Sequence, residues 1–234
     1  MRQIVFDLET TGFRFDEGHR IVEIGAVELV RGAITGKNFH VYVNPERDMP
    51  QGAFEVHGLS EKFLRDKPVF TDPSVAQAFL DFIGDDGQLI AHNGKGFDLP
   101  FLNAELAAAG LRTLDAGASI DTLHMARRKF PGSPASLDAL CSRFGIDTKE
   151  RERDGHGALL DSKLLAEVYI ELTGGAQAGL DFNDEEEGDF RAADGDVKAR
   201  RRPTPLAPRV SAEEAAAHAA FVEELGPDCL WAKR

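Results

Sequence analysis

Two carboxylates stand one position apart near the start of the chain, at the end of an apolar run. Asp7 and Glu9 belong to "IVFDLETTGF" (4–13), in which three apolar residues precede them. Residues i and i+2 of a β-strand point to the same face, about 6.5–7 Å apart. Two carboxylates at that distance must take up a proton or share a cation. Alone, the pair is equally compatible with two solvated acids on an exposed strand.

Two further motifs add acids and a histidine. Asp98 in "AHNGKGFDLPFL" (91–102) stands where a predicted strand leads into a helix. Helix capping is the alternative to a chemical role, since Asp is a favoured N-cap. His156 lies between two glycines, five positions before Asp161. Five helical residues turn a helix by about 140°, so both side chains reach one centre only if His156 stays in the entry loop. A solvated histidine and a surface acid are the alternative.

The elements predicted around these motifs form an α/β domain with a mixed sheet. Gly-containing breaks separate segments rich in Val, Ile and Phe, as a meander of strands requires. The pattern then alternates between strand and helix, which is typical of a mixed sheet covered by helices. Strands are predicted at 2–8, 20–30, 37–45 and 87–93, and helices at 74–84, 98–110, 119–130, 136–145 and 157–175.

The composition limits how the protein binds its partners. Of its 234 residues 42% are hydrophobic, and the formal net charge is −13, which argues against holding nucleic acid by bulk positive charge. An acidic nuclease is compatible with this charge if metal ions and a local basic patch supply the attraction. The run Arg127–Lys129 offers either phosphate contacts or a solvated helix face. Without a long apolar segment or a secretory signal, and with only two cysteines, the sequence predicts a cytoplasmic protein with no membrane partner.

In combination the motifs are far more specific than each one alone. D-x-E at the end of a first strand, F-D at a strand-to-helix junction and H-x₄-D at a late helix occur in this order. Together they resemble the DEDDh family of 3′–5′ exonucleases. The segments "FDLETTGF" (6–13) and "HGALLDSKLLAEVYIELTGG" (156–175) resemble in particular the members that proofread for bacterial replicative DNA polymerases. The resemblance covers about residues 1–175 and returns in the tail, and it implies a ribonuclease H-like fold, a central mixed β-sheet flanked by helices.

The resemblance assigns a role to each of the five residues. It implies two divalent cations, Mg²⁺ or Mn²⁺, and His156 as the general base. The ligands of the cations would be Asp7, Glu9, Asp98 and Asp161. Oxygen ligands suit these hard ions, and a pair of ions about 3.5–4 Å apart stabilises both the attacking and the leaving oxygen at phosphorus. A histidine pKa of about 6.5 suits deprotonation of water near neutral pH, and flanking glycines would let His156 swing in when substrate binds.

The resemblance also suggests contacts to the 3′-terminal nucleotide, at Thr10, Thr11, His57 and Asn93. For the threonines the alternative is capping of the turn before Gly12, and for His57 it is an ordinary surface or packing role. The chain departs from the family between Asn93 and Phe97, where it carries one extra residue. That residue lies in "GKG" (94–96), whose glycines absorb an altered loop path. Asp98 remains the expected ligand, whereas a hydrogen bond at the strand end is the alternative role of Asn93.

Beyond residue 175 the character of the sequence changes. Residues 181–196 hold eight acids and a single Arg, and "KARRRP" (198–203) follows. The range 176–203 is therefore predicted to be a disordered linker, first acidic and then basic. Within it "QAGLDF" (177–182) resembles peptides that insert apolar side chains into the sliding clamp, through Gln177, Leu180 and Phe182. The bare pattern is weak, and its place at the edge of the domain is what supports it.

The last segment, 204–234, resembles a polymerase-binding tail. "SAEEAAAHAAFVEELG" (211–226) has the S-x-x-E spacing of a capping box at Ser211 and Glu214. A helix there offers little to bury alone, so an interface is expected to use the apolar residues of the tail, which are Phe221, Leu225, Leu230 and Trp231. A helix folded back on its own domain is the alternative.

The sequence therefore predicts a metal-dependent 3′–5′ exodeoxyribonuclease that proofreads for a replicative polymerase. It would remove nucleotides from single-stranded or frayed 3′ ends of DNA as nucleoside 5′-monophosphates. The expected partners are the catalytic (alpha) subunit of DNA polymerase III, the sliding clamp (beta) and a small accessory subunit. Two alternatives stay open. A related exonuclease that trims RNA or oligonucleotides would need no such tail, and a non-catalytic bridge between clamp and polymerase would not need all five catalytic residues.

Overall fold

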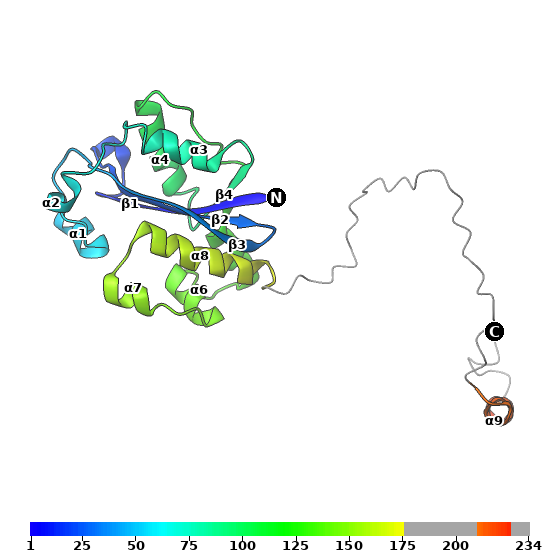
Figure 1. The fold of residues 1–234 in the computed structure, drawn as a ribbon. Helices are drawn as coiled ribbons and strands as arrows, with labels where there is room; N and C mark the ends of the chain where they lie inside the picture. The colour runs from blue at the N-terminus through cyan, green and yellow to red at the C-terminus, as the bar shows by residue number, and fades with distance from the viewer. Residues whose placement is uncertain (176–209, 226–234) are drawn as a thin grey trace, which may run out of the picture. The chain divides into compact units, whose positions relative to one another are not determined.

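A mixed sheet forms the centre of the first part of the chain. The computed structural model describes residues 1–175 and 210–225. In the first of these parts, five strands lie in the order β3-β2-β1-β4-β5 (Figure 1). The antiparallel strands are β1 (Arg2–Thr10), β2 (Ile21–Val30) and β3 (Ala33–Tyr42). On the other side of β1, the strands β4 (Gly87–Ala91) and β5 (Ile120–Asp121) pair in parallel. The predicted mixed sheet is confirmed.

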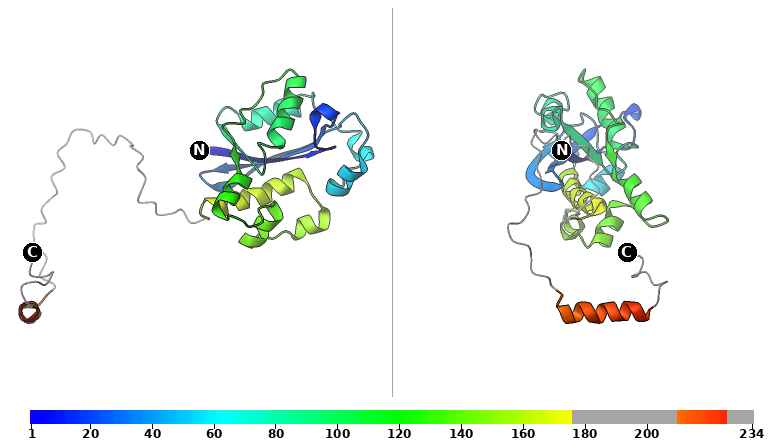
Figure 2. Two further views of the ribbon diagram at one scale, coloured as in Figure 1. Left: turned by 180° about the vertical axis from the view of Figure 1, so that it is seen from behind. Right: turned by 90° about the vertical axis from the view of Figure 1, so that its right-hand side faces the viewer.

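Helices cover both faces of this sheet (Figures 1 and 2). They are α1 (Gln51–His57), α2 (Glu61–Leu64), α3 (Ala76–Ile83), α4 (Asp98–Ala108), α5 (Thr122–Lys129), α6 (Leu137–Phe144), α7 (Lys149–Asp154) and α8 (Ala158–Thr173), with a 3₁₀ turn η1 (Phe15–Glu17). α3 and α4 pack on one face, and α8, with α6 beside it, packs on the other. α1 and α2 lie at the end of the sheet where β1 ends.

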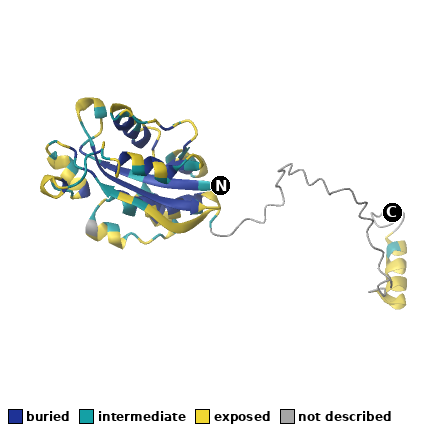
Figure 3. Cartoon of the chain, turned by 45° about the horizontal axis from the view of Figure 1, so that its top comes forward, coloured by how far each residue is buried: buried dark blue, intermediate teal, exposed yellow. Residues whose placement is uncertain are grey.

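Apolar residues on both faces of β1 place this strand inside the domain. Ile4, Phe6 and Leu8 belong to the core cluster that includes residues of α3 and α4, whereas Val5 packs with residues of α8. Successive side chains of a strand alternate between the two faces, so Asp7 continues the row of Val5 on the α8 side. Figure 3 shows the buried strands between helices whose outer faces are exposed. The strand that carries the first carboxylates is therefore held by the core on both sides.

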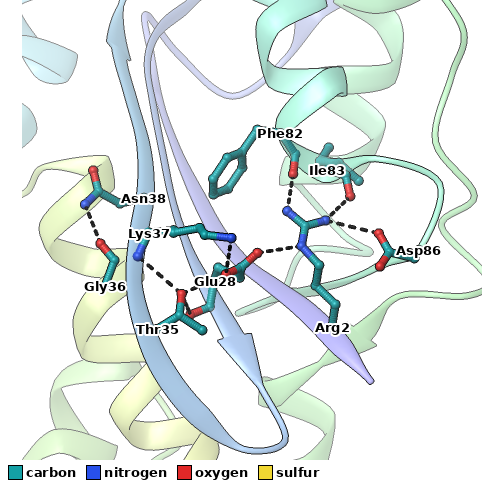
Figure 4. Close-up of polar contacts among 9 residues, drawn as sticks. All are labelled: Arg2, Glu28, Thr35, Gly36, Lys37, Asn38, Phe82, Ile83 and Asp86. Atoms are coloured by element: carbon teal, nitrogen blue, oxygen red, sulfur yellow. Dashed lines mark hydrogen bonds and ion pairs between the residues drawn. The ribbon is translucent and has the colours of Figure 1, made fainter.

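A network of polar contacts anchors the start of β1, whereas Glu9 lies near the other end of this strand (Figure 4). The Nε of Arg2 lies 2.6 Å from the Oε1 of the buried Glu28 in β2, and its Nη1 donates a 2.6 Å hydrogen bond to the carbonyl of Ile83 in α3. Thr35 of β3 donates to Glu28 at 2.8 Å. The hydrogen bonds from Arg2 and Thr35 lower the pKa of Glu28. The network thus ties β1 to β2, β3 and α3.

The strand β3 begins earlier than predicted. Arg31 and Gly32 have positive φ angles of 54° and 76°, and such a two-residue turn matches the twist of antiparallel strands. The turn is therefore complete by Gly32, and residues 33–36, expected to be a connection, belong to β3.

The predicted helix at 119–130 is wrong at its start. Ile120–Asp121 pair with β4 as the short strand β5, and the carboxylate of Asp121 caps α5 by accepting a 3.0 Å hydrogen bond from the N–H of Leu123. The basic run at the end of α5 is partly structural, because Lys129 donates to the carbonyl of Leu172 in α8 at 2.8 Å. The short helices α1, α2 and α7 were not predicted, since so few residues show no helical period.

The second described part, 210–225, contains the helix α9 (Ala212–Glu224). Its predicted capping box is confirmed: Ser211 accepts a hydrogen bond from the N–H of Glu214 at 3.2 Å, and Glu214 accepts one from the N–H of Ser211 at 2.8 Å. Phe221 and Leu225 are 57% and 49% exposed. Within the described ranges, no helix is long and apolar enough to cross a membrane. Outside them lie most of the predicted linker and tail, including Gln177, Leu180, Phe182, Leu230 and Trp231.

Candidate active site

The end of β1 brings two carboxylates to one face of the sheet, as the alternation of a strand predicts. Asp7 and Glu9 follow Val5 on the side toward α8, and Glu9 is buried. In the register of the sheet Glu9 lies opposite Glu23 of β2, and the pairing shifts between Glu9 and Thr10. The strand therefore becomes irregular directly after its second carboxylate.

Asp98 is the first residue of α4, and its carboxylate faces β1. The backbone N–H of Leu8 in β1 donates a hydrogen bond to it. Phe97, not Asp98, occupies the N-cap position of the helix, so capping does not account for this acid. Asp98 is 4% exposed, which means that a charge placed there is almost completely removed from water.

His156 stays in the loop between α7 and α8, which is the condition under which it reaches Asp161. Gly155 ends α7 with a positive φ of 82°, and α8 begins at Ala158. The Nδ1 of His156 lies 3.2 Å from the Oδ2 of Asp161. One ligand-type atom each of Glu9, His156 and Asp161 lie within 4.8 Å of one another. The structure thus brings together groups from both ends of the domain.

A close contact between β2 and the start of α8 holds Asp161 against the sheet. A Cβ atom on Gly25 would lie 2.1 Å from the backbone N of Leu159 and 2.2 Å from the carbonyl carbon of Ala158. Ser162 fastens the same contact, because its hydroxyl donates a 2.9 Å hydrogen bond to the carbonyl of Gly25. The helix can approach the strand this closely only because residue 25 has no side chain.

Burial raises the pKa of all four carboxylates, and the charges of other acids in the site add to this for Asp7 and Glu9. Burial, and then the charge of Asp161, raises the pKa of Glu9 to about 8. Burial raises the pKa of Asp98 to about 7. The pKa of Asp7 lies well above its usual range, because of burial first and then the charges of Asp98 and Glu9. Burial also raises the pKa of Asp161.

This donor set fits divalent cations. Carboxylates that are buried together are costly to ionise, and a shared positive charge favours their ionised forms. Oxygen atoms are the ligands that Mg²⁺ and Mn²⁺ prefer. The set is contributed by β1, by the start of α4 and by the start of α8, so its geometry is fixed by the core rather than by one flexible loop.

Two further charged residues of the site were not singled out in the sequence. The Nε of Arg151 in α7 lies 2.7 Å from the Oδ1 of Asp161, and the buried Glu23 of β2 lies 2.7 Å from the Nε2 of His40. Arg151 belongs to the charged run "KERERD" (149–154), which has the composition of a solvated helix. For Glu23 a signal was present, since antiparallel pairing of the first two strands can place it opposite Glu9.

A pocket of about 360 Å³ adjoins the carboxylates. Glu9 forms part of its wall, and apolar surface comes from Val56 and Phe97 among others. Three of the four residues predicted to contact the substrate also line it, namely Thr10, Thr11 and His57. The pocket therefore opens directly beside the candidate metal ligands.

The two threonine hydroxyls brace the turn that follows β1. Thr10 donates a 2.7 Å hydrogen bond to the carbonyl of Gly12, and Thr11 accepts one of 3.0 Å from the N–H of Arg20. This supports the turn-capping role. The N–H of Thr11 also donates to the carbonyl of Arg20 at 2.9 Å, so the two threonines are left to contact a ligand through the wall of the pocket. His57 is buried, and burial lowers its pKa.

Asn93 does not line this pocket and serves the turn that carries the extra residue. Its φ is 61°, its N–H donates to Asp121 at 3.1 Å, and its carbonyl accepts from the N–H of Gly96 at 2.9 Å and of Phe97 at 3.1 Å. The longer loop is thus closed by its own hydrogen bonds before α4. A substrate contact at Asn93 stays a prediction.

Comparison with known proteins agrees with this geometry. Residues 4–169 match the exonuclease family (RNase_T). A DNA polymerase III subunit epsilon from Rickettsia felis is 46% identical over 228 residues, which span 96% of this chain and 97% of that protein.

Two solved structures share the fold. Exonuclease X in complex with 5′ overhanging duplex DNA superposes with a TM-score of 0.55 at 26% identity, over 74% of this chain and 90% of that one. The nuclease domain of 3′hExo, a DEDDh family member, bound to rAMP, gives a TM-score of 0.60 at 21% identity, over 74% and 91%.

The fold and the carboxylate centre define a 3′–5′ exonuclease with the ribonuclease H-like architecture that the sequence predicts. Exonucleases of the DEDDh type depend on divalent metal ions, which the donor set fits. The chain belongs to the exonuclease family and, within it, to the epsilon subunits of DNA polymerase III.

Proposed function

We propose that this exonuclease proofreads for a replicative DNA polymerase. It acts on single-stranded or frayed 3′ ends of DNA and releases nucleoside 5′-monophosphates. The observation that carries the proposal is the convergence of Glu9, His156 and Asp161 within 4.8 Å, beside a pocket that Glu9 also lines. A terminal nucleoside fits that pocket, because about 360 Å³ falls within the range of small-ligand sites.

The four carboxylates would hold two divalent cations, Mg²⁺ or Mn²⁺, and His156 would serve as the general base. When bound, such cations stabilise the charge that develops on the oxygens around phosphorus. The side chain of His156 is 43% exposed and has Asp161 beside its Nδ1. Its Nε2 is then the atom that takes the proton of the attacking water, while the carboxylate orients the ring.

The substrate pocket would recognise a nucleotide by its position at the 3′ end and would not distinguish one base from another. Thr10, Thr11 and His57 surround the terminal nucleotide, and the apolar surfaces of Val56 and Phe97 stack on a base or sugar without reading its hydrogen-bonding edge. From the turn before α4, Asn93 would contact the part of the DNA strand that adjoins the terminal nucleotide. Such a site tolerates every terminal base, as proofreading requires.

The rest of the chain would attach this domain to the replication machinery. We assign residues 1–175 to the exonuclease domain, 176–203 to a flexible linker and 204–234 to a tail that binds the polymerase alpha subunit. Support comes from the Rickettsia felis relative, whose alignment spans 96% of this chain, and from the exposed Phe221 and Leu225 of α9. Leu230 and Trp231 complete that interface. Gln177, Leu180 and Phe182 would dock to the sliding clamp, and a small accessory subunit is a further expected partner.

A cleavage assay on four labelled oligonucleotides tests the catalytic proposal. The full chain with Mg²⁺ or Mn²⁺ is given single-stranded DNA, a matched primer–template, the same primer with a mismatched 3′ end, and RNA. We expect the frayed and single-stranded DNA ends to be degraded faster than the matched end and the RNA. Equal or faster cleavage of RNA would favour the RNA-trimming alternative. If the mismatched primer is left intact, only the bridging role survives.

Two variants and a control separate catalysis from assembly. Asp7→Ala and His156→Ala should abolish cleavage while polymerase binding in a pull-down is retained. His124→Ala, which changes an exposed histidine of α5, should leave both unchanged. Cleavage by Asp7→Ala at the wild-type rate would contradict the assignment of the ligands.

Deletion of residues 204–234 tests the tail. The shortened chain should lose polymerase binding and keep its nuclease activity. Within the intact tail, Phe221→Ala with Leu225→Ala should weaken binding, whereas Glu213→Ala on the same helix serves as the matched control. Loss of both activities on deletion would mean that the tail belongs to the core of the domain.

A further inference from the structure

A single arginine bridges two of the groups assigned to catalysis. The Nε of Arg151 lies 2.7 Å from the Oδ1 of Asp161, and its Nη2 lies 3.0 Å from the Oδ2. The same Nη2 lies 2.8 Å from the Nδ1 of His156. The side chain of Arg151 is only 9% exposed, so the contact is a buried one rather than a surface ion pair.

This arrangement puts a permanent positive charge where a cation would bind. A guanidinium stays protonated at all physiological pH values. Here its Nη2 donates a hydrogen bond to Oδ2 of Asp161, while Nε and Oδ1 form a close ion pair without hydrogen-bond geometry. Asp161 and His156 belong to the group of ligand-type atoms that converge with Glu9. The positive charge of Arg151 therefore lies beside Asp161 and His156, where a bound metal ion would also supply one. This charge lowers the pKa of Asp161 and so acts against burial, which raises it.

We propose that Arg151 is a built-in counter-cation that competes with the divalent metal ion for Asp161 and holds His156 until the ion binds. Metal entry would displace the guanidinium from Asp161 and, in the same event, release the imidazole of His156 for its role as a base. The inference rests on the proposed assignment of Asp161 as a metal ligand and adds a residue that the ligand set itself does not include.

The displaced guanidinium has an acidic resting place beside it. Its Nη1 already contacts the carboxylate of Asp138 in α6, which is 70% exposed. A hollow of about 540 Å³ adjoins this contact, lined by Asp138, Ser142, Thr148, Glu152 and His156 together with Arg151 itself. Arg151 can thus give up Asp161 and keep Asp138, so that its charge remains paired throughout.

Metal titration of the full chain provides the test, with Mn²⁺ as the probe and electron paramagnetic resonance of the free ion as the readout. Arg151→Met keeps the length of the side chain but removes the competing charge. We expect its Mn²⁺ affinity to rise by on the order of tenfold, the size of one pairwise coupling. In chelator, the melting temperature should fall relative to wild type, because Asp161 has lost its partner, and Mn²⁺ should restore it.

Three further variants make the result specific. Lys149→Gln removes an exposed positive charge from the same helix, one that pairs with Asp147, and should leave the affinity unchanged. Arg151→Lys retains the charge without the guanidinium and should give an intermediate affinity. Asp138→Asn removes the resting place, holds the arginine on Asp161 and should weaken Mn²⁺ binding.

The possible outcomes separate this inference from the proposed function. If the wild-type chain binds no Mn²⁺, metal binding at the site fails and the competition fails with it. If wild type binds Mn²⁺ but Arg151→Met binds it equally or more weakly, the competition alone is overturned. Should Arg151→Met fail to fold, the affinities of Arg151→Lys and Asp138→Asn must still shift in opposite directions, and no shift in either would overturn the proposal.

Discussion

The hydroxyl of Ser162 donates a 2.9 Å hydrogen bond to the carbonyl oxygen of Gly25, and this bond fastens α8 to β2 beside the catalytic centre. Asp161 precedes Ser162 directly in the sequence, so the bond also limits where the carboxylate can lie. The position of Asp161, a proposed metal ligand, is thus set by a glycine on a neighbouring strand that has no chemistry of its own.

Gly25→Ala should therefore damage both stability and catalysis. The added Cβ meets backbone atoms of α8 at 2.1–2.2 Å, and overpacking of this kind costs about 1–3 kcal/mol. Displacement of Asp161 and His156 by about 1 Å would lower kcat by on the order of 100-fold. Ser162→Ala, which removes only the hydrogen bond, should cost about 1 kcal/mol. Denaturant unfolding and single-strand cleavage measure the two effects, and a fully active Gly25→Ala would refute the positioning argument.

The two glycines beside His156 should respond differently to alanine. Gly155 has a φ of 82°, which a side chain disfavours by about 1–2 kcal/mol. Gly157 has an extended φ of −156°, and a Cβ there would meet its nearest atoms at 3.9 Å, which is ordinary contact. Turnover and melting temperature should fall in Gly155→Ala and stay near wild type in Gly157→Ala. Equal losses in both variants would mean that mobility on each side of His156, rather than backbone conformation, is required.

Neutralising one member of the carboxylate cluster should stabilise the metal-free protein while it abolishes activity. The pKa of Glu9 is raised to about 8 by burial and by Asp161, so its charged form is unfavourable in the fold. Glu9→Gln keeps the shape without the charge, and its melting temperature in chelator at pH 9 should exceed that of wild type. Glu61→Gln, at an exposed helix start, is the control with no expected gain. A lower melting temperature for Glu9→Gln would argue against repulsion.

The stability of the metal-free protein should fall as the pH rises from 6.5 to 9. Burial raises the pKa of Glu9 to about 8 and that of Asp98 to about 7, so the folded state retains protons that the unfolded chain has already lost. Groups with a raised folded-state pKa stabilise at low pH and lose this contribution as the pH passes that value. The window begins at pH 6.5 because burial lowers the pKa values of His57 and His92. Below that pH these two histidines make the stability rise with pH, which is opposite to the effect of the carboxylates.

Thermal melts at a series of pH values check this linkage. With chelator, the melting temperature should decrease through the window, and with saturating Mg²⁺ the decrease should shrink, because the cation favours the ionised carboxylates. A melting temperature that rises with pH in chelator would show that the carboxylates are ionised without cost.

Local periodicity was enough to predict how one strand and one helix position residues of the site. The i, i+2 spacing of Asp7 and Glu9 correctly places both on one face, and the long apolar pattern of α8 correctly leaves His156 in its entry loop. These features depend only on the geometry of one strand or one helix. The ribonuclease H-like architecture followed from the order of the motifs rather than from any single one.

What the sequence could not supply are relationships between distant elements. Arg151 lies in a run of alternating charges whose composition matches a solvated helix, and only the folded structure shows that it contacts Asp161. The register of β1 and β2 places Glu23 opposite Glu9. The sequence predicts that the two strands pair but does not fix the register in which they do so. A two-residue strand such as β5 carries no periodic signal at all.

The proposed site draws on both ends of the domain, with Asp7 and Glu9 in the first strand, His156 in the loop before α8 and Asp161 in α8. During synthesis the ribosome delivers the first two of these residues early and the last two only when nearly the whole domain has been made. A chain that ends before Gly155 has three of the four acids and lacks both His156 and Asp161. We therefore expect products of incomplete translation to lack nuclease activity, because the order of the sequence supplies the last members of the site only at the end of the domain.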